Sequence, residues 1–324
     1  MCRPYYSVVK FMKKDAKIVL PGGAGLVGQN LVARLLQRGY TNIVVLDKHE
    51  ANLAILRKTH PSITAEYADL AKAGIWGRHF ENADSVVMLQ AQIGGINYSE
   101  FENNNVVSTK NILNLVKKND VPYLVHISSS VVESVADDFY TRSKKAQENL
   151  VLESGIPCPI LRPTLMFGWF DRKHLGWLSR FMQRVPVFPI PGNGKFMRQP
   201  LYAGDFANII INCVESRICP EIFNITGREK IDYIDIIRAI KSSTGAKAKL
   251  LKIPYGLFYL LLKIYALVDR DPPFTAAQLK ALVAHDEFEV IDWPAIFNVT
   301  PTPFSKAIDE TFHHPLYSKV VLEF

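Results

Sequence analysis

Cysteine is scarce in this chain and is not arranged as a metal site. The 324 residues include four cysteines, at positions 2, 158, 213 and 219, which form no CxxC pair and no cluster with histidine. Structural zinc sites need such ligands at short spacings, and small secreted domains rely on many disulfides. The cysteine pattern therefore argues against a metal site and for a reducing compartment.

Long apolar runs and a secretory signal are also missing. Residues 1–15 mix basic and aromatic side chains, and the longest apolar stretch, residues 257–268, is interrupted by Lys263 and too short to span a bilayer. We therefore expect a cytoplasmic protein with no integral membrane segment. Residues 257–268 are expected to form a helix that packs in a second lobe or against a partner subunit, with attachment to a membrane surface as the alternative.

The basic charge of the chain does not indicate a nucleic-acid partner. The formal net charge is +7, but five basic residues and one acidic residue among residues 1–17 contribute +4 of it. Residues 1–15 are thus expected to be a basic extension, and the rest of the chain is only mildly basic. Nucleic-acid binding, which requires a concentrated basic surface, is not supported.

Glycine is concentrated in residues 17–38. A short apolar run is followed there by Gly22, Gly25 and Gly28, and then by apolar residues at helical spacing, which predicts a strand, a tight turn and a helix. In such a turn glycine lets the pyrophosphate of a dinucleotide approach the backbone, and the helix amides face the phosphates. The alternative is that these glycines serve the turn alone.

A carboxylate ends the next apolar run. Residues 43–46 are followed by Asp47, 19 residues after Gly28, where it can accept hydrogen bonds from the adenosine ribose. Because this carboxylate would repel a 2′-phosphate, NAD is favoured over NADP. Lys48 and His49 could soften that preference, and Asp47 could instead be a plain turn residue.

Short apolar runs and helical segments then alternate. A helix over 51–58 and strands over 63–67 and 85–89 predict a parallel sheet with helices on both faces, with a ligand along the carboxyl ends of the strands. Asp69 stands at such an end and suits the adenine amino group. The loop over residues 90–95 either lies along the cofactor or simply precedes the next helix.

A tyrosine and a lysine follow a strand that ends in three serines. A helix over 103–117 and a strand over 123–127 are expected, and Tyr140 and Lys144 begin a helix eleven residues beyond Ser129. Four residues apart, the two side chains share a helix face, where an ammonium can lower the phenol pKa toward neutrality. Such a phenol can exchange the proton of a substrate hydroxyl while hydride moves to or from a nicotinamide. The alternative is an exposed tyrosine and lysine.

Taken in this order, these motifs resemble the extended short-chain dehydrogenase/reductases, in particular the NAD-dependent nucleotide-sugar epimerase/dehydratase branch. The resemblance covers nearly the whole chain from about residue 16. It implies an α/β fold: a Rossmann-type doubly wound parallel sheet in residues 16–165 that binds NAD. A smaller C-terminal α/β substrate lobe is implied in residues 166–324, with some segments returning to the sheet.

The resemblance also assigns roles to individual residues. Asn105 would brace the active-site backbone, and Pro163 would lie beside the nicotinamide. Ser129 would be the catalytic serine, and Ser130 is the alternative candidate for that role. Arg198 grips the nucleotide diphosphate, as suits a guanidinium fork; the alternative is a surface arginine in a glycine-rich loop. The implied catalytic residues are Ser129, Tyr140 and Lys144; the implied cofactor residues are Gly22, Gly25, Leu26, Val27, Gly28, Asp47, Lys48, Asp69, Leu70, Leu89, Gln90, Ala91, Asn105, Ile127, Ser128, Tyr140, Lys144 and Pro163; and the implied substrate residues are Gln92, Ser129, Ser130, Thr164 and Arg198.

Some positions depart from the family pattern. Pro21 stands in the usual threonine place, and Leu165 stands where many nucleotide-sugar enzymes carry asparagine. Ser130 and Val131 replace the Asp-Glu pair with which 4,6-dehydratases eliminate water. The resemblance therefore implies a homodimeric epimerase that acts on a nucleotide-diphosphate sugar through a 4-keto intermediate. The alternatives are a 4-ketoreductase, a 4,6-dehydratase, or a structural NAD(P)-binding protein without chemistry, as in an accessory subunit of respiratory complex I.

Overall fold

The structure is a computed structural model that describes residues 12–268, 275–283 and 288–323. Most of the expected basic extension, residues 1–11, lies outside the described residues.

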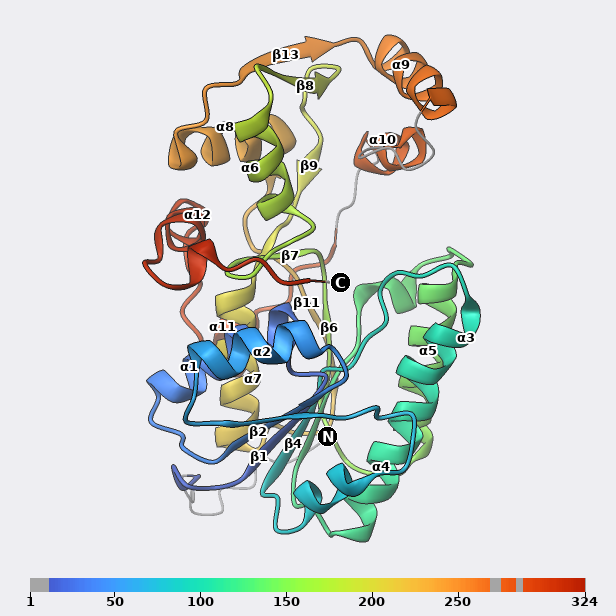
Figure 1. The fold of residues 1–324 in the computed structure, drawn as a ribbon, viewed down its shortest axis with the longest axis vertical. Helices are drawn as coiled ribbons and strands as arrows, with labels where there is room; N and C mark the ends of the chain where they lie inside the picture. The colour runs from blue at the N-terminus through green and yellow to red at the C-terminus, as the bar shows by residue number, and fades with distance from the viewer. Residues whose placement is uncertain (1–11, 269–274, 284–287, 324) are drawn as a thin grey trace.

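A seven-stranded parallel sheet forms the centre of the protein (Figure 1). Its strands lie in the order β11-β6-β5-β4-β1-β2-β3, and every neighbouring pair is parallel. This arrangement confirms the predicted Rossmann-type sheet. The strands are β1 (Ile18–Pro21), β2 (Ile43–Asp47), β3 (Thr64–Tyr67), β4 (Ser85–Met88), β5 (Leu124–Ile127), β6 (Ile160–Pro163) and β11 (Ile222–Ile225).

Helices cover both faces of this sheet, because successive residues of a strand point to opposite sides. In β1, Ile18 and Leu20 join an apolar core with α1 and α7, whereas Val19 joins a second core with α4 and α5. Two separate cores thus hold the sheet, as in a doubly wound fold. One face carries α1 (Leu26–Gln37), α2 (Glu50–Thr59), α7 (Ala203–Ser216) and α11 (Trp293–Phe297), and the other carries α4 (Ser108–Lys118) and α5 (Phe139–Glu153).

The segment before α4 differs from the single helix that the apolar periodicity predicts. The short helix α3 (Tyr98–Phe101) leads into a π-helical turn (Glu102–Val107) and only then into α4. Such turns often mark functional sites. This one contains Asn104 and Asn105, which both hydrogen-bond to Gln92. Apolar periodicity could not predict the π-helical turn, because it carries no information about such polar contacts.

A smaller lobe lies at the top of Figure 1, beyond the carboxyl ends of β6 and β11. Its own apolar core is formed mainly by α6, α8 and α12, which agrees with the predicted C-terminal α/β lobe. Its strands pair only two by two: β8 with β13, β9 with β12, and β7 with β10. The elements are β7 (Met166–Phe167), α6 (Leu175–Arg184), β8 (Val187–Pro191), β9 (Met197–Arg198), β10 (Leu201–Tyr202), β12 (Ile231–Asp232), α8 (Tyr233–Thr244), β13 (Lys249–Ile253), α9 (Tyr255–Val268), α10 (Ala276–Val283) and α12 (Phe304–His313).

Helix α9 buries Phe258 but is otherwise largely exposed, so the structure shows only part of the packing expected for it in the lobe or against a partner subunit. None of its residues belongs to the apolar core of the lobe within the described chain, and four of its aliphatic side chains are about half exposed. Within the described ranges, no helix is both long and apolar enough to cross a membrane.

Arg34 of α1 joins the sheet domain to the lobe. Its guanidinium donates hydrogen bonds to the Tyr202 hydroxyl and to Glu310, both at 3.0 Å, and lies 4.4 Å from the centre of the Trp169 ring. The charge is nearly buried and is balanced by these partners, so its removal leaves them unsatisfied.

We expect Arg34→Met to lower the free energy of unfolding by about 1–3 kcal/mol, because it removes a partly buried ion pair and a cation–π contact. Chemical denaturation measures the change. Arg57→Met, at an exposed pair with Glu50, is the matched control and should cost less than about 1 kcal/mol. Equal losses in the two variants would contradict this account of the domain junction.

Candidate active site

The glycine-rich turn between β1 and α1 permits a close approach. Gly22 has a φ of +76°, and a Cβ there would lie 2.3 Å from the backbone nitrogen of Gln90. A Cβ at Gly28 would lie 2.2 Å from the Gly23 carbonyl oxygen. The N-cap of α1, Gly25, has no side-chain cap within the described chain, and the first turn of α1 has no acidic residue. Its free amides fit the pyrophosphate of NAD.

Asp47 is held at the end of β2 by two backbone amides. Its carboxylate accepts hydrogen bonds from the amides of Ala24 and His49, both at 3.0 Å. Burial raises the pKa of Asp47, and the amides oppose that shift. Lys48 donates to the Asn104 side chain at 2.7 Å, so its ammonium already has a partner away from Asp47. This arrangement suits a ribose better than a 2′-phosphate.

The other predicted cofactor residues follow the carboxyl edge of the sheet. Asp69 comes after β3, and the hydrogen bond from Lys72 lowers its pKa, because that bond favours the carboxylate. The carbonyl of the buried Leu70 accepts a hydrogen bond from Asn111 at 2.9 Å. Leu26 and Val27 open α1, and Leu89, Gln90 and Ala91 follow β4. Ile127 ends β5 and Ser128 follows it, and Pro163 ends β6.

Asn105 is fully buried and ties the loop after β4 to α5. Its side-chain oxygen accepts from the Gln92 amide at 2.6 Å, and its amide group donates to the Gln92 carbonyl at 3.2 Å and to the Ser143 hydroxyl at 2.9 Å. A neighbouring hydroxyl, Thr109, accepts from Gln90 at 3.1 Å and from Gln147 at 3.0 Å. These buried bonds hold the loop, α4 and α5 in one arrangement.

Ser129 and Tyr140 come together at the junction of β5 and α5. Tyr140 lies in the first turn of α5, where Asp138 caps the helix by accepting from the Thr141 amide at 2.9 Å. Burial raises the pKa of the Tyr140 phenol, and a hydrogen bond with Ser129 opposes the shift. The Ser129 and Tyr140 hydroxyls therefore lie within hydrogen-bond reach of each other.

Lys144 is almost completely buried, with 1% of its surface exposed. Its ammonium donates to the Ile127 carbonyl at 3.1 Å and to the Gln147 side chain at 2.5 Å. Burial lowers the Lys144 pKa to about 7, although the charge of Glu148 opposes the shift.

The structure thus corrects the expectation that Lys144 brings the Tyr140 pKa down toward neutrality. Burial acts on both groups and disfavours the charged form of each, so it raises the phenol pKa and lowers the ammonium pKa. Sequence spacing places the two side chains on one helix face, but it carries no information about how deeply each is buried.

Ser128 and Glu148 form a second buried pair below the site. The Ser128 hydroxyl donates to Glu148 at 2.5 Å, and the Arg162 guanidinium donates to both carboxylate oxygens of Glu148. The Ser128 hydroxyl is therefore committed to a structural contact. No motif in the sequence marks Glu148, Arg162, Thr109, Ser143 or Gln147 as a site residue, because their roles come from contacts between separate elements.

The predicted substrate residues of the loops lie in different surroundings. Thr164 is buried, and its hydroxyl has no hydrogen-bond partner among the described residues, which leaves it available to a ligand. The side-chain oxygen of Gln92 accepts from Asn104 at 2.8 Å, so this side chain is held by its own loop. Ser130 is half-buried and begins a short 3₁₀ turn, residues 130–133.

Arg198 lies in the lobe and not beside the tyrosine and lysine of α5. It belongs to β9, which pairs antiparallel with β12, and its guanidinium donates to the carbonyls of Met197 and, in α10, of Leu282. The structure therefore orients the guanidinium in part through backbone carbonyls.

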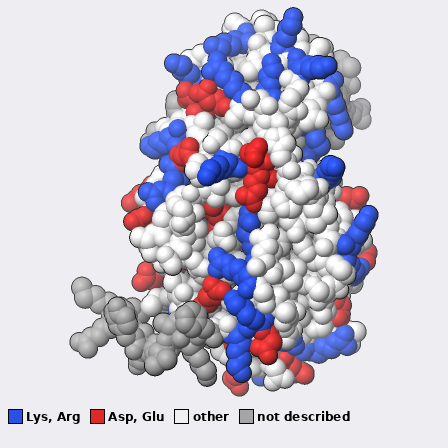
Figure 2. All heavy atoms as spheres, turned by 90° about the vertical axis from the view of Figure 1, so that its left-hand side faces the viewer, with Lys and Arg blue, Asp and Glu red and all other residues white. Residues whose placement is uncertain are grey.

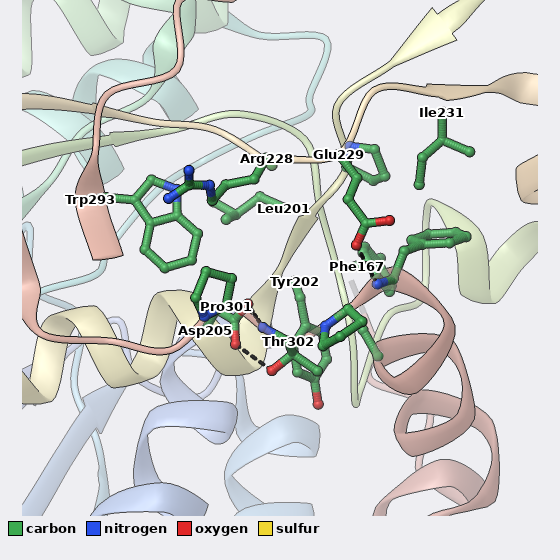
Figure 3. A pocket seen from close by; sticks show the side chains of 15 residues that line it. Phe167, Leu201, Tyr202, Asp205, Arg228, Glu229, Ile231, Trp293, Pro301 and Thr302 are labelled. Carbon is green, nitrogen blue, oxygen red and sulfur yellow. Dashed lines mark hydrogen bonds between the residues drawn. The ribbon is translucent and has the colours of Figure 1, made fainter. Parts of the chain in front are cut away.

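A cavity of about 270 Å³ lies elsewhere, between α7, α12 and the loop after β11 (Figure 3). Two carboxylates face it, and both have partners. Asp205 accepts from the Thr302 hydroxyl at 2.6 Å and amide at 2.9 Å, and Glu229 accepts from the Phe304 amide at 2.6 Å. The cavity thus holds structural contacts between the sheet domain and the lobe, and none of the predicted site residues lines it.

Comparison with known proteins identifies the family of the chain. The family model described as "NAD dependent epimerase/dehydratase family" matches residues 18–226. The chain is 23% identical to a mouse protein named "Sterol-4-alpha-carboxylate 3-dehydrogenase, decarboxylating", over 94% of this chain and 92% of the mouse protein. It is also 23% identical to an Escherichia coli O157:H7 protein named "N-acetyl-alpha-D-glucosaminyl-diphospho-ditrans,octacis-undecaprenol 4-epimerase", over 92% and 94% of the two chains.

Two further similarities bear on the fold and on the alternatives. A Dictyostelium discoideum protein named as mitochondrial "NADH dehydrogenase [ubiquinone] 1 alpha subcomplex subunit 9" is 23% identical over 89% of this chain and 81% of its own. The crystal structure of a UDP-glucuronic acid 4-epimerase from Bacillus cereus in complex with NAD superposes with a TM-score of 0.70 at 19% identity, over 91% and 96% of the two chains. That superposition confirms the fold.

The lowered pKa of Lys144 predicts a pH dependence of stability. Between pH 7 and about 10.5, the ordinary pKa of lysine, the unfolded chain binds the proton that the folded chain has released. Stability therefore rises with pH across this window by an amount on the order of 3–5 kcal/mol. We expect Lys144→Met to abolish this rise and to be more stable than wild type below pH 7.

Denaturation curves at several pH values between 6 and about 10 measure the rise. Lys145→Met is the matched control, because the Lys145 ammonium is only partly buried and donates to the Ser134 carbonyl. It should keep the pH dependence of the wild type. An unchanged pH profile in Lys144→Met would reject the assignment.

Proposed function

Because the chain belongs to the NAD dependent epimerase/dehydratase family, we propose that it is an NAD-dependent epimerase of nucleotide-diphosphate sugars that works through a 4-keto intermediate. One observation carries the proposal: Ser129 hydrogen-bonds to Tyr140 in the first turn of α5, the helix that also carries the buried Lys144. These residues lie at the carboxyl edge of the sheet that has the glycine turn. Relatives named as epimerases of diphosphate-linked sugars support this choice.

The residues divide the chemistry among themselves. The glycine turn and Asp47 would hold NAD, which would supply the hydride acceptor and donor for the sugar carbon. Tyr140 removes the proton of the sugar 4-hydroxyl and later gives it back, while Ser129 donates a hydrogen bond to the same oxygen. Lys144, with a pKa of about 7, is half protonated near neutral pH and can hold the proton that the phenol must lose. Asn105 positions the loop after β4 opposite them.

The sheet domain and the lobe share the substrate contacts in this proposal, and Arg198 is the contact from the lobe. Arg198 holds the diphosphate, Thr164 offers its unpaired hydroxyl, and Gln92 and Ser130 line the sugar. We further propose residues 16–165 as the NAD-binding domain and residues 166–324 as mainly the substrate lobe. The protein would act as a homodimer in the cytoplasm. The buried thiols Cys158 and Cys213, which form no disulfide, are in keeping with a reducing compartment.

Three other functions from the same family compete with epimerisation. A 4-ketoreductase would share the Ser-Tyr-Lys set, whereas a 4,6-dehydratase needs an acid/base pair where this chain has Ser130 and Val131. A structural NAD(P)-binding role is supported by the similarity to the Dictyostelium complex I subunit and by Leu165. Retention of Ser129, Tyr140 and Lys144 together favours catalysis.

Tyr140→Phe should lose turnover by about 10²–10⁴-fold, because proton transfer by one positioned group is deleted. NAD affinity should stay near that of the wild type. The assay follows UDP-, dTDP- and GDP-sugars deuterated at C4 by NMR; an epimerase keeps the deuterium in the product and accumulates no NADH. Full activity of the Phe variant would reject Tyr140, and stoichiometric use of added NADH would identify a ketoreductase.

Asp47 should make NAD bind at least about tenfold more tightly than NADP, because its carboxylate repels a 2′-phosphate. Asp47→Asn should narrow that ratio, whereas Lys48→Ala should leave it nearly unchanged. Calorimetric titration of both nucleotides measures the ratio. Equal or tighter binding of NADP by the wild type would show that Lys48 and His49 face the ribose.

A further inference from the structure

Arg162 of β6 contacts both the segment after β5 and helix α5. In β6, Ile160 packs in the apolar core with α4 and α5, whereas Leu161 packs in the core on the opposite face of the sheet. Because successive strand residues point to opposite faces, the Arg162 side chain lies on the same side as Ile160. There it reaches two carboxylates: that of Glu148, in α5, and that of Glu133, at the end of the 3₁₀ turn after β5.

The contact with Glu148 is buried and fixes the start of the segment after β5. The Arg162 guanidinium donates to both carboxylate oxygens, which is the bidentate geometry that makes an arginine–carboxylate pair directional. The same carboxylate accepts from the Ser128 hydroxyl at 2.5 Å, while the Ser128 amide donates to the Leu161 carbonyl at 2.8 Å. Ser128 is therefore held to α5 by its side chain and to β6 by its backbone.

The contact with Glu133 fixes the end of the same segment. One guanidinium nitrogen of Arg162, Nη1, donates to Glu133 Oε1 at 2.8 Å. The Asn224 side chain donates to that oxygen at 3.0 Å, and Asn224 lies directly beside Arg162 in the register of β11 and β6. Two donors on neighbouring strands thus hold the last residue of the 3₁₀ turn. We call Arg162, Glu133 and Glu148 together the Arg162 clamp.

Ser129 lies between the two anchored ends. Its hydroxyl accepts from the Val131 amide at 3.4 Å, and its carbonyl accepts from the Val132 amide at 3.2 Å, so Ser129 begins the 3₁₀ turn. The segment 128–133 is short and fixed at both ends, which leaves its backbone little conformational freedom. The place of the Ser129 hydroxyl beside Tyr140 therefore depends on where the clamp holds those ends.

Burial distinguishes the Arg162–Glu148 pair from ion pairs at the surface. Figure 2 shows one face of the molecule, on which Lys and Arg often lie beside Asp and Glu. Exposed pairs of this kind contribute little, because solvent screens them and both side chains stay free to move. Only 16% of the Arg162 side chain and 5% of the Glu148 side chain are exposed, so removing one partner would leave the other charge buried and unpaired. This pair can therefore hold one geometry where a surface pair would not.

We propose that Arg162 is a positioning residue for the reaction, because it holds residues 128–133 in the one place where the Ser129 hydroxyl meets Tyr140. The inference rests on the proposed function, in which these two hydroxyls act on the same sugar oxygen. Arg162 acts through the two carboxylates and not on the substrate. Lysine cannot replace it fully, because an ammonium lacks the planar fork that binds Glu148 with two nitrogens and Glu133 with the third.

Hydrogen exchange of the full-length, substrate-free protein tests the clamp independently of activity. We expect Arg162→Lys and Glu133→Ala each to speed exchange of the amides of residues 128–134 by at least about tenfold, because their local opening becomes easier. Exchange in α4 should stay as in the wild type. Glu133 is half exposed and its loss leaves the Arg162–Glu148 pair intact, so Glu133→Ala keeps the test valid where an Arg162 variant fails to fold.

Arg217→Met is the matched control. Arg217 also makes several hydrogen bonds, to Asp84 and Ser85, but these lie at the amino end of β4, at the opposite edge of the sheet from Ser129. This variant should exchange residues 128–134 at the wild-type rate and should keep the wild-type turnover.

A double-variant cycle tests whether the clamp serves Ser129. Arg162→Lys should lower the turnover of whichever UDP-, dTDP- or GDP-sugar the wild type converts by about 10–100-fold, with KM and NAD affinity within about threefold of wild type, because a misplaced group is lost from the chemical step and not from binding. In the Ser129→Ala background the same change should cost less than about threefold, since the group that it misplaces is already gone.

Unchanged exchange in both clamp variants would overturn the proposal, and so would the same acceleration in Arg217→Met. A loss of turnover that is equal with and without Ser129 would also overturn it, because Arg162 would then act on stability alone. Wild type that converts none of these sugars, while the exchange results hold, would reject the proposed function, and with it the catalytic use of a clamp that the exchange data support.

Discussion

The candidate site depends on a buried hydrogen-bond network that joins three separate elements. The Asn105 side chain hydrogen-bonds to both the backbone amide and the carbonyl of Gln92. The Thr109 hydroxyl accepts hydrogen bonds from the side-chain amides of Gln90 and Gln147. Gln147 in turn accepts from the Lys144 ammonium. Because buried polar groups are costly when unpaired, this network tolerates only one arrangement of the loop after β4, α4 and α5. The approach of that loop to Gly22 follows from the same constraint.

The fold and the local motifs could be predicted from the sequence, because both arise from short-range patterns. Apolar runs predict the positions of the strands. Glycine is required at position 22, because a Cβ on this residue of the turn would collide with the loop after β4. The Tyr140 and Lys144 spacing correctly put both residues near the start of one helix. These features follow from steric rules that act within a few residues.

The rest depends on contacts between distant residues, which local patterns do not carry. The polar partners of the π-helical turn, residues 102–107, come from the loop after β4, and the Arg162–Glu148 pair joins β6 to α5. The direction of the Tyr140 pKa shift was mispredicted because it depends on burial. The exposure of α9 could not be predicted either, because it also depends on burial. An apolar run indicates only that a helix needs a partner, not which one.

The central claim is that the glycine turn and the buried network form a site for NAD and a nucleotide sugar. Mass spectrometry of the small molecules released when the purified protein is denatured tests it most directly. The account predicts NAD or NADH near one per chain, and a nucleotide-diphosphate sugar after incubation with a mixture of such sugars. Release of NADP in its place, or of no dinucleotide even after incubation with NAD, would contradict the account.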